Sequence, residues 1–269
     1  MSIASRISVY IIAYNEADKI VAAIRSVSWA DEIIVADSGS TDGMIQKAES
    51  LEARVVQIPF QGFGDLRNQA IAHCQYPWIF SLDADERCTP ELADEIKSTI
   101  DAKNASDVYR VPRRNFFMGR WIRHSGWYPN YRQPQLFRKG AMKYTLEPVH
   151  EGFELMTARP IGHLKHPLWQ VPFASLDEVI HKANRYSTLG AEKLAQRGVK
   201  RSMAGALLRG LWSFFKHYFL KLGFLDGWPG FVIAFGNFEG TFYKHAKHYC
   251  RSIEWQPDSE DRGQRTEDR

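Results

Sequence analysis

The stretch Trp78-Ile79-Phe80-Ser81-Leu82-Asp83-Ala84-Asp85 decides the fold, because it joins an apolar run directly to two carboxylates. An apolar run of this length is typical of a buried strand. Ligands of an open α/β sheet bind at the carboxyl ends of its strands, where aspartate oxygens suit a divalent cation. Aspartate is also favoured in turns, so the position alone leaves a capped turn equally open. The rest of the chain is needed to choose between a cation site and a capped turn.

The first hundred residues alternate between short apolar runs and segments with helical periodicity. We expect strands at residues 7–12, 32–36, 54–57 and 78–83, and helices at 16–27, 42–51, 65–74 and 90–100. Such alternation predicts βαβ units and an α/β fold with a mostly parallel sheet flanked by helices. No G-x-G-x-x-G follows the first run, so the dinucleotide-binding fingerprint is absent.

Polar clusters follow three of the expected strands. They are Tyr14-Asn15-Glu16, the run from Asp37 to Gly43, and Asp83-Ala84-Asp85. Each cluster alone could be an ordinary turn or a helix N-cap. Three of them at the carboxyl ends of successive strands indicate one binding crevice.

The composition and periodicity of the sequence change twice in the second half of the chain. Aromatic residues, arginines and prolines dominate residues 107–162, where we expect strands and loops, including a strand at 135–138. Helical periodicity returns at residues 177–197, 203–222 and 229–249. We therefore expect an α/β domain over residues 1–170, a helical extension over 171–256, and a disordered tail over 257–269.

Composition narrows the class of protein. The chain has 269 residues, 44% of them hydrophobic, which is enough for a large core, and a net charge of only +4. That charge does not indicate a nucleic-acid binder. Three cysteines without metal-ligand spacing suggest a reducing compartment. We expect no signal peptide and no membrane span, and so a cytoplasmic location. The cysteines are Cys74, Cys88 and Cys250.

The three polar clusters, with the strand before the first, resemble the signatures of family 2 glycosyltransferases. The resemblance covers about residues 6 to 165 and is carried by residues 8–16, 37–42 and 83–85. It implies the GT-A fold and a nucleotide-sugar donor. Residues 62–68, 149–151 and 225–230 are most similar to bacterial lipopolysaccharide inner-core β-1,4-glucosyltransferases that act on heptose.

The resemblance implies a role for each matched residue. Asp37 would hydrogen-bond the uracil ring, Asp83 would face the ribose or the metal's water shell, and Asp85 would bind Mg²⁺ or Mn²⁺ directly. Arg67 opens a helix after a glycine-rich loop and could pair with the diphosphate, although an exposed arginine is the ordinary alternative. The donor-binding set is Ala13, Tyr14, Glu16, Asp37, Ser38, Arg67, Asn68, Asp83 and Ala84.

The segment from Leu146 to Glu151 is the second chemical centre. An inverting transfer needs a base that takes the proton from the acceptor hydroxyl, and a carboxylate is the usual choice. Glu151 is our candidate, with Glu147 as the alternative. His150 could be a further metal ligand or contact the diphosphate, although a lone histidine is more often satisfied within its loop. Many relatives carry an acidic pair where this chain has His150-Glu151, so the identity of the base stays open.

Two regions suggest the acceptor and its location. Arginines alternate with aromatic residues between 113 and 132, which suits an anionic oligosaccharide; an aromatic core with exposed arginines is the alternative. The helices after residue 200 are basic and amphipathic, so they could lie in a membrane interface or pack on the α/β domain. The five arginines are Arg113, Arg114, Arg120, Arg123 and Arg132.

Taken together, the sequence predicts an inverting hexosyltransferase that moves glucose from UDP-glucose to heptose of the lipopolysaccharide inner core. Its expected partners are the UDP-sugar donor, a lipid-linked core oligosaccharide and the inner face of the cytoplasmic membrane, with no nucleic acid. The alternatives are a family 2 enzyme for another lipid-linked or cell-surface glycan, a nucleotidyltransferase, and a non-catalytic relative.

Overall fold

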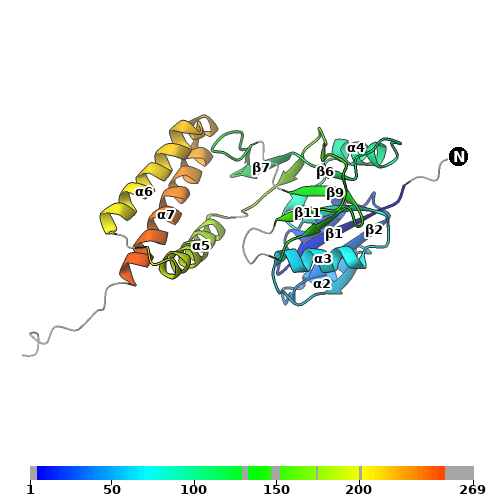
Figure 1. Cartoon of the computed structure of the whole chain (residues 1–269), viewed down its shortest axis with the longest axis horizontal. Coiled ribbons are helices and arrows are strands. Elements are labelled where there is room, and N and C mark those ends of the chain that lie inside the picture. Colours follow the sequence, from blue (N-terminus) through cyan, green and yellow to red (C-terminus); the bar gives the residue numbers. More distant parts are fainter. Residues whose placement is uncertain (1–4, 129–132, 147–151, 174, 200–201, 252–269) are drawn as a thin grey trace, which may run out of the picture. The chain divides into compact units, whose positions relative to one another are not determined.

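The computed structural model describes residues 5–128, 133–146, 152–173, 175–199 and 202–251, which form two compact units (Figure 1). The sheet unit comprises the residues up to Arg123 together with Trp127–Pro172. The helical unit comprises His124–Gly126 and the residues from Phe173 onward. The predicted tail at 257–269 lies outside the described residues.

A central sheet organises the sheet unit. Over the described residues it has seven strands in the order β12-β6-β9-β4-β1-β2-β3. Only β9 runs antiparallel to its neighbours β4 and β6, so the predicted mostly parallel sheet is confirmed. The strands are β1 (Ile7–Ala13), β2 (Glu32–Asp37), β3 (Arg54–Gln57), β4 (Trp78–Asp83), β6 (Val108–Arg110), β9 (Pro134–Arg138) and β12 (Gly162–His163).

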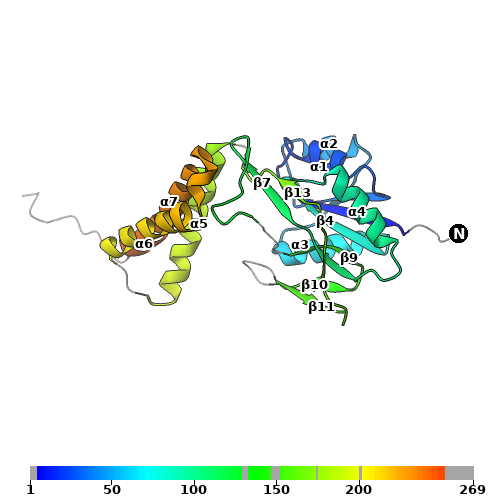
Figure 2. The same cartoon turned by 90° about the horizontal axis from the view of Figure 1, so that it is seen from above.

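Helices cover both faces of this sheet (Figure 2). One face packs against α1 (Ile20–Ser26), α2 (Met44–Glu49) and α4 (Pro90–Ile100). The other face packs against α3 (Phe63–His73) and the hairpin of β10 (Met142–Tyr144) and β11 (Phe153–Leu155). Because β1 is buried on both faces, it is apolar except at Ser8, as is typical of strands in parallel sheets.

A smaller sheet continues from the acidic end of β4. It contains β5 (Glu86–Arg87), β13 (Leu168–Gln170), β7 (Arg113–Phe117) and β8 (Arg120–Trp121), in that order. Pairing of β5 with β13 brings Gln170 opposite Glu86, although 84 positions separate the two residues in the chain. This sheet therefore builds long-range contacts around Asp83-Ala84-Asp85.

Two helices differ from their predicted bounds by more than two residues at one end. The helix expected from residue 16 begins at Ile20, because Asn15 has a left-handed φ of 53° and residues 16–19 form a turn instead. The helix expected over 203–222 consists of α6 (Met203–Phe215) followed by a π-helical turn at Lys216–Leu220. Leu222, with φ of 56°, then breaks the helix.

In the helical unit, α7 (Trp228–Cys250) packs against both α5 (Leu176–Gln196) and α6. None of the helices within the described ranges is both long and apolar enough to cross a membrane. Small residues make the close contacts: a Cβ at Gly210 of α6 would lie 2.9 Å from the ring of Phe238 on α7.

The segment from Leu225 to Gly230 has a structural explanation. Asp226 is buried and accepts a hydrogen bond from the His124 backbone N–H at 3.0 Å, while its other oxygen lies 3.1 Å from His124 Nδ1. Gly227 has φ of 68°, a conformation that favours glycine. A Cβ at Gly230 would lie 1.9 Å from the Gly223 carbonyl oxygen, so only glycine fits there. The motif holds the start of α7 against the preceding turn and the loop at 124–126.

Candidate functional site

The register of the central sheet brings the three predicted polar clusters to one edge. Ala13 on β1 pairs with Asp37 on β2, and the neighbouring Ile12 pairs with Asp83 on β4. All three strands run in the same direction, so their carboxyl ends meet. The convergence expected from the sequence is present in the fold, and this sheet edge is the candidate functional site.

Hydrogen bonds lock the first two loops of this edge together. Asn15 donates its backbone N–H to Ser40 Oγ and accepts the Thr41 N–H on Oδ1, both at 2.8 Å. Asp42 accepts the Ala17 N–H at 2.8 Å and the Met44 N–H at 3.1 Å. The sequence analysis assigned no role to Asn15, although asparagine is among the few residues that tolerate its left-handed φ.

Two predicted donor contacts, Tyr14 and Glu16, flank Asn15 in this loop. The Tyr14 side chain is 59% exposed, so its ring is accessible. Glu16 forms an ion pair with Lys19 at 3.0 Å. Both residues belong to the loop that Asn15 fixes, so their backbone positions are set without any ligand.

Asp37 is completely buried at the end of β2. Its carboxylate accepts the Gly39 and Ser40 N–H groups at 3.1 Å, together with the Ser40 hydroxyl. The loop thereby holds the carboxylate in one orientation. Next to it, Ser38 Oγ is a buried atom with no hydrogen-bond partner among the described residues. Buried hydroxyls are normally satisfied, so Ser38 is a suitable contact for a bound polar ligand.

Arg67 lies against the acidic loop and is only 8% exposed. Its guanidinium donates to Asp83 Oδ1 at 2.8 Å and to Ser81 Oγ at 3.0 Å, and it lies 5.5 Å from the Tyr144 ring. Burial opposes its charge, but Asp83 together with Tyr10 and Tyr144 outweighs burial and raises the pKa of Arg67. The alternative of an exposed arginine is wrong.

Asn68, the next residue, ties α3 to the hairpin. Its side chain donates to the Tyr144 carbonyl at 2.9 Å and accepts the Tyr144 N–H at 3.0 Å. Both polar groups of the Asn68 amide are therefore used within the fold. This contact holds β10, which leads into the segment after Leu146, beside the N-terminal half of α3.

The acidic loop contains a third carboxylate that the sequence analysis did not single out. Glu86 is completely buried and accepts the Asp83 N–H and the Gln135 side-chain N–H, each at 3.0 Å. Its other oxygen lies 2.5 Å from Arg113 Nη2. The signal was available, since Glu86 follows the aspartate pair directly, but its partners come from distant strands. Glu86 fixes the backbone of Asp83.

Two buried carboxyl groups of this loop have raised pKa values. Burial, with a further contribution from the Asp83 charge, raises the pKa of Asp85 to about 6. Burial also raises the pKa of Glu86 to about 8, although Arg113 favours its charged form. Gln170 donates to Asp85 Oδ2 at 3.0 Å and orients that carboxylate.

These carboxylates fit a hard divalent cation. Asp83 and Asp85 supply oxygen atoms two residues apart, and a cation would offset the charge that raises the Asp85 pKa. Within the ranges that the structure describes, no group of three His, Cys, Asp or Glu side chains could by itself hold a metal ion. The further predicted ligand His150 and the two candidate bases Glu147 and Glu151 lie outside the described residues.

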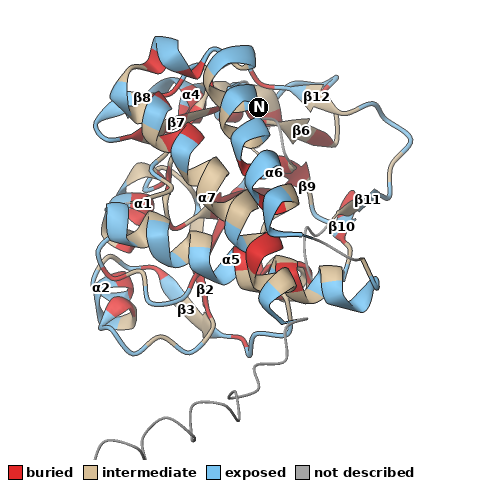
Figure 3. Cartoon of the chain, turned by 90° about the vertical axis from the view of Figure 1, so that its left-hand side faces the viewer, coloured by how far each residue is buried: buried red, intermediate tan, exposed pale blue. Residues whose placement is uncertain are grey.

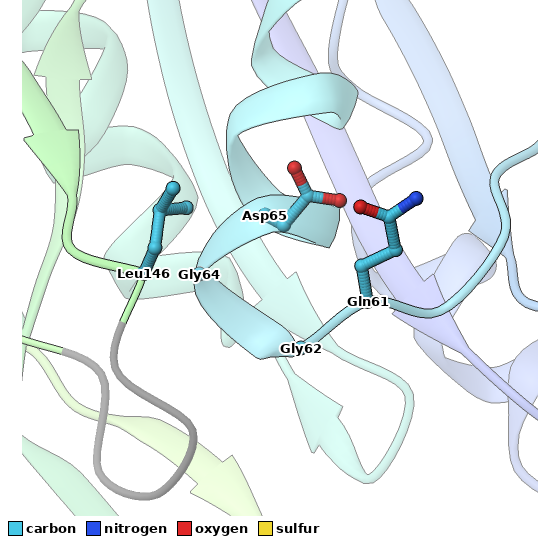
Figure 4. A pocket seen from close by; sticks show the side chains of 5 residues that line it. All are labelled: Gln61, Gly62, Gly64, Asp65 and Leu146. Carbon is cyan, nitrogen blue, oxygen red and sulfur yellow. The ribbon is translucent and has the colours of Figure 1, made fainter.

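A small pocket of about 90 Å³ lies at the start of α3 (Figure 4). Leu146 stands on one side of it and Gln61 with Asp65 on the other. Gln69 donates to Asp65 at 2.6 Å, which fixes the acidic wall. The pocket adjoins the predicted chemical segment, because Leu146 directly precedes residues 147–151. It is lined by Gln61, Gly62, Gly64, Asp65 and Leu146.

The predicted arginine-rich acceptor surface divides into different environments. Arg113 is buried on Glu86 and is therefore part of the core of the acidic loop. Arg114 and Arg123 lie on Trp121, with guanidinium carbons 4.4 Å and 4.3 Å from its ring centre. Arg132 lies outside the described residues. The Trp121 cluster is thus the part of the region where a cationic and an aromatic surface coincide.

Comparison with known proteins decides the family. Residues 8–161 match the model of glycosyl transferase family 2, which is more than half of the chain. The chain belongs to this family. Its matched region contains β1, β2, β4 and all three polar loops. The protein is therefore a glycosyltransferase, and the predicted GT-A α/β fold is confirmed. The family decides against the nucleotidyltransferase alternative.

Two relatives cover most of the chain. An uncharacterized glycosyltransferase of Rickettsia bellii is 32% identical over 84% of this chain and 80% of its own length. The lipopolysaccharide core biosynthesis glycosyltransferase LpsC of Rhizobium meliloti is 30% identical over 89% of this chain and 93% of its own. Both alignments extend well beyond the family 2 region, so the resemblance includes part of the helical unit.

Among solved structures, a glucosyl-3-phosphoglycerate synthase of Mycobacterium tuberculosis in complex with Mn²⁺ and UDP-glucose is 27% identical to this chain. The similarity covers 41% of this chain and 44% of that one, with a TM-score of 0.37.

Proposed function

We propose that this glycosyltransferase transfers glucose from UDP-glucose to heptose of the lipopolysaccharide inner core, with inversion at the sugar. The observation that carries the proposal is the convergence of the loops after β1, β2 and β4 at one sheet edge. The similarity to LpsC supports a core oligosaccharide as the acceptor.

In this proposal the sheet edge binds the donor. Asp37 and Ser38 would contact the uridine, with Ala13, Tyr14 and Glu16 lining the same pocket. The orientation of the Asp37 carboxylate and the unsatisfied Ser38 hydroxyl support this role. Arg67 and Asn68 would act through the acidic loop and the β10 hairpin, since their side chains are already bonded there.

Asp85 would hold Mg²⁺ or Mn²⁺, with Asp83 and Ala84 beside the ribose or the metal's water shell. The cation would offset the charge that develops on the departing diphosphate. The buried Asp85 carboxyl, whose pKa the neighbouring Asp83 charge helps to raise, supports a cation there. His150 would be a further ligand or would contact the diphosphate.

The acceptor hydroxyl needs a base, and we assign it to Glu151, with Glu147 as the alternative. A carboxylate that takes this proton during attack on the anomeric carbon accounts for inversion. The pocket lined by Leu146 supports the assignment, because Leu146 immediately precedes this segment in the sequence. The arginine and tryptophan cluster around Trp121 would contact an anionic core oligosaccharide.

We further propose that the reaction takes place at the inner face of the cytoplasmic membrane, where a lipid-linked acceptor would be presented. The test of the whole proposal is a panel of nucleotide sugars assayed against purified truncated core lipopolysaccharide. UDP-glucose with a heptose-terminated acceptor should give product and UDP. Product with another donor, or another acceptor glycan, would overturn the assignment of glucose or heptose.

The base is tested by two substitutions in the same assay. Glu151→Gln should abolish transfer while UDP still raises the melting temperature in the presence of Mn²⁺. Near-normal turnover of Glu151→Gln, together with loss in Glu147→Gln, would move the base to Glu147.

A further inference from the structure

The helical unit buries small residues and exposes large apolar ones. On α6, Ala206 and Gly210 are buried, and Gly210 approaches Phe238 of α7 closely. Phe214 of the same helix packs against Phe231 of α7, but other large side chains are exposed: Leu208 is 66% exposed and Trp212 is 59% exposed. A helix of a water-soluble protein normally buries its large apolar stripe. Helices that face lipid commonly have small residues at their contacts with other helices and large apolar residues on the outside.

In Figure 3 much of α6 is coloured as exposed, and exposed apolar side chains are also present beyond its end. Leu220 in the π-helical turn is 59% exposed, and Trp228 at the start of α7 is 77% exposed. Soluble monomers rarely expose large contiguous apolar patches. We define the apolar face as Leu208, Leu211, Trp212, Phe215, Leu220 and Trp228, all of them exposed.

Basic residues accompany this face, and acidic ones do not. Residues 203–225 contain Arg209, Lys216 and Lys221 but no aspartate or glutamate. Arg209 and Lys216 are exposed. The next acidic residue, Asp226, is buried against His124. Exposed cations beside an apolar surface are complementary to anionic lipid headgroups, and tryptophan is enriched where headgroups meet acyl chains.

We infer that the apolar face inserts into one leaflet of an anionic phospholipid bilayer, with α6 lying along the membrane surface. Arg209 and Lys216 then lie at the level of the headgroups. This inference deepens the proposed function, because it names the surface by which the enzyme reaches a lipid-linked acceptor. The sequence left open whether the apolar stripe packs internally; Leu208, Leu211, Trp212 and Phe215 of α6 do not.

The test uses the full chain and vesicles of phosphatidylcholine with or without phosphatidylglycerol. The protein should float with the anionic vesicles. A Leu208→Ser and Trp212→Ser double variant should bind them at least about tenfold more weakly, because two inserted side chains are lost. The matched control is Met156→Ser: Met156 is 64% exposed but belongs to the sheet unit, so its variant should bind as the parent does.

The basic residues are tested separately. An Arg209→Gln and Lys216→Gln double variant should lose about fivefold in binding for each removed charge. The parent and this variant should differ on anionic vesicles and not on phosphatidylcholine alone. Equal binding of the two proteins to anionic vesicles would contradict the role of the basic residues.

Two outcomes would overturn the inference. One is that the parent fails to bind anionic vesicles, or that the Leu208 and Trp212 variant binds them equally well. The other is a dimer in sedimentation equilibrium that this variant abolishes, without vesicle binding; a second copy of the chain would then cover the face. UDP binding by calorimetry separates this inference from the proposed function. It should be equal in parent and variants, and its absence from the parent would count against the donor site only.

Discussion

The sheet unit and the helical unit are stabilised in opposite ways. The sheet unit buries large apolar side chains on both faces of its sheet, and it also buries charged groups beside the functional edge, among them Asp37, Arg67, Glu86 and Arg113. The helical unit buries glycine and alanine at its helix contacts, where rings such as Phe214 and Phe238 also pack, and leaves several leucine, phenylalanine and tryptophan side chains at the surface. The sheet unit is therefore built around a polar site, whereas the helical unit has an apolar exterior.

The two units should therefore be sensitive to different kinds of substitution. In the sheet unit, removal of one buried charge leaves another without its partner. In the helical unit, addition of one methyl group obstructs a close backbone approach. Four substitutions test this contrast, beginning with the largest expected effect.

Removal of Glu86 should damage the sheet unit most. Glu86→Met leaves the Arg113 guanidinium buried without its carboxylate and leaves the Asp83 N–H without its acceptor. We expect the free energy of unfolding to fall by about 3–5 kcal/mol in urea denaturation. Glu192→Met is the control, because Glu192 and Arg251 form an exposed pair in the helical unit. Its cost should stay below about 1 kcal/mol, and similar costs at both sites would contradict the contrast.

Asp85→Asn should remove activity while keeping the fold. If Asp85 holds the cation, turnover in the transfer assay should fall at least about 100-fold, since changes to metal-site carboxylates cost that much or more. The melting temperature should change little. Asp94→Asn on the exposed surface of α4 is the matched control and should keep full turnover. Undiminished turnover of Asp85→Asn in Mn²⁺ would refute the metal role.

The helical unit should respond to a single methyl group. Gly230→Ala would bring a Cβ to 1.9 Å from the Gly223 carbonyl oxygen, so the start of α7 must shift. We expect a loss of about 1–3 kcal/mol in unfolding free energy and faster proteolysis of this unit.

The same helix supplies the control for that substitution. A Cβ at Gly240 meets no atom within 4 Å. Gly240→Ala should therefore stabilise the protein by up to about 1 kcal/mol through helix propensity. If both alanines had the same effect, the close approach at Gly230 would have no energetic role.

The smallest expected effect concerns pH and the sheet unit. Burial opposes the Glu32 charge, but the Ser8 hydroxyl, the Gln75 N–H and Arg54 outweigh it and lower the pKa of Glu32 below its ordinary value of 4.5. A lowered folded pKa stabilises the protein above the ordinary value, and this contribution disappears as the pH falls through the lowered pKa.

Glu32→Gln should therefore cost about 1 kcal/mol at neutral pH. The difference from the parent should vanish in acid below the lowered pKa of Glu32. Denaturation curves at several pH values measure this. A difference that stays constant into acid would show that the Glu32 charge does not contribute.

Much of the sheet unit could be predicted from the sequence. The runs at residues 7–12 and 54–57 are strands in the structure. The first is buried along its whole length, and such a strand is mainly apolar. The convergence of Asp37 and Asp83 followed from strand direction alone, and the register confirms it.

The supporting residues could not be predicted in the same way. Glu86 depends on Arg113 and Gln135, which reach it only after three strands from distant parts of the chain have paired. The sequence was equally consistent with an exposed Arg67, because nothing in the neighbouring sequence indicates that Ser81 and Asp83 lie within its reach. Such contacts depend on tertiary neighbours and have no periodic signal.

The helices of the second unit show the same limit. Their periodicity predicted amphipathic helices at the right places, apart from the π-helical turn. The period of 3.6 residues says which side chains share a face, but not whether that face lies inside or outside. On α6 the close approach of Gly210 to Phe238 decides this, and it turns Leu208 and Trp212 outward.

The sequence by itself determined the family, the order of strands and helices, and the acidic and hydroxyl residues at the strand ends. These are local properties, because each depends on a short run of residues. Only the tertiary structure decided which charges are paired in the interior and which apolar residues remain at the surface. Burial and ion pairing are relations between segments far apart in the chain, so they exist only once the chain has folded.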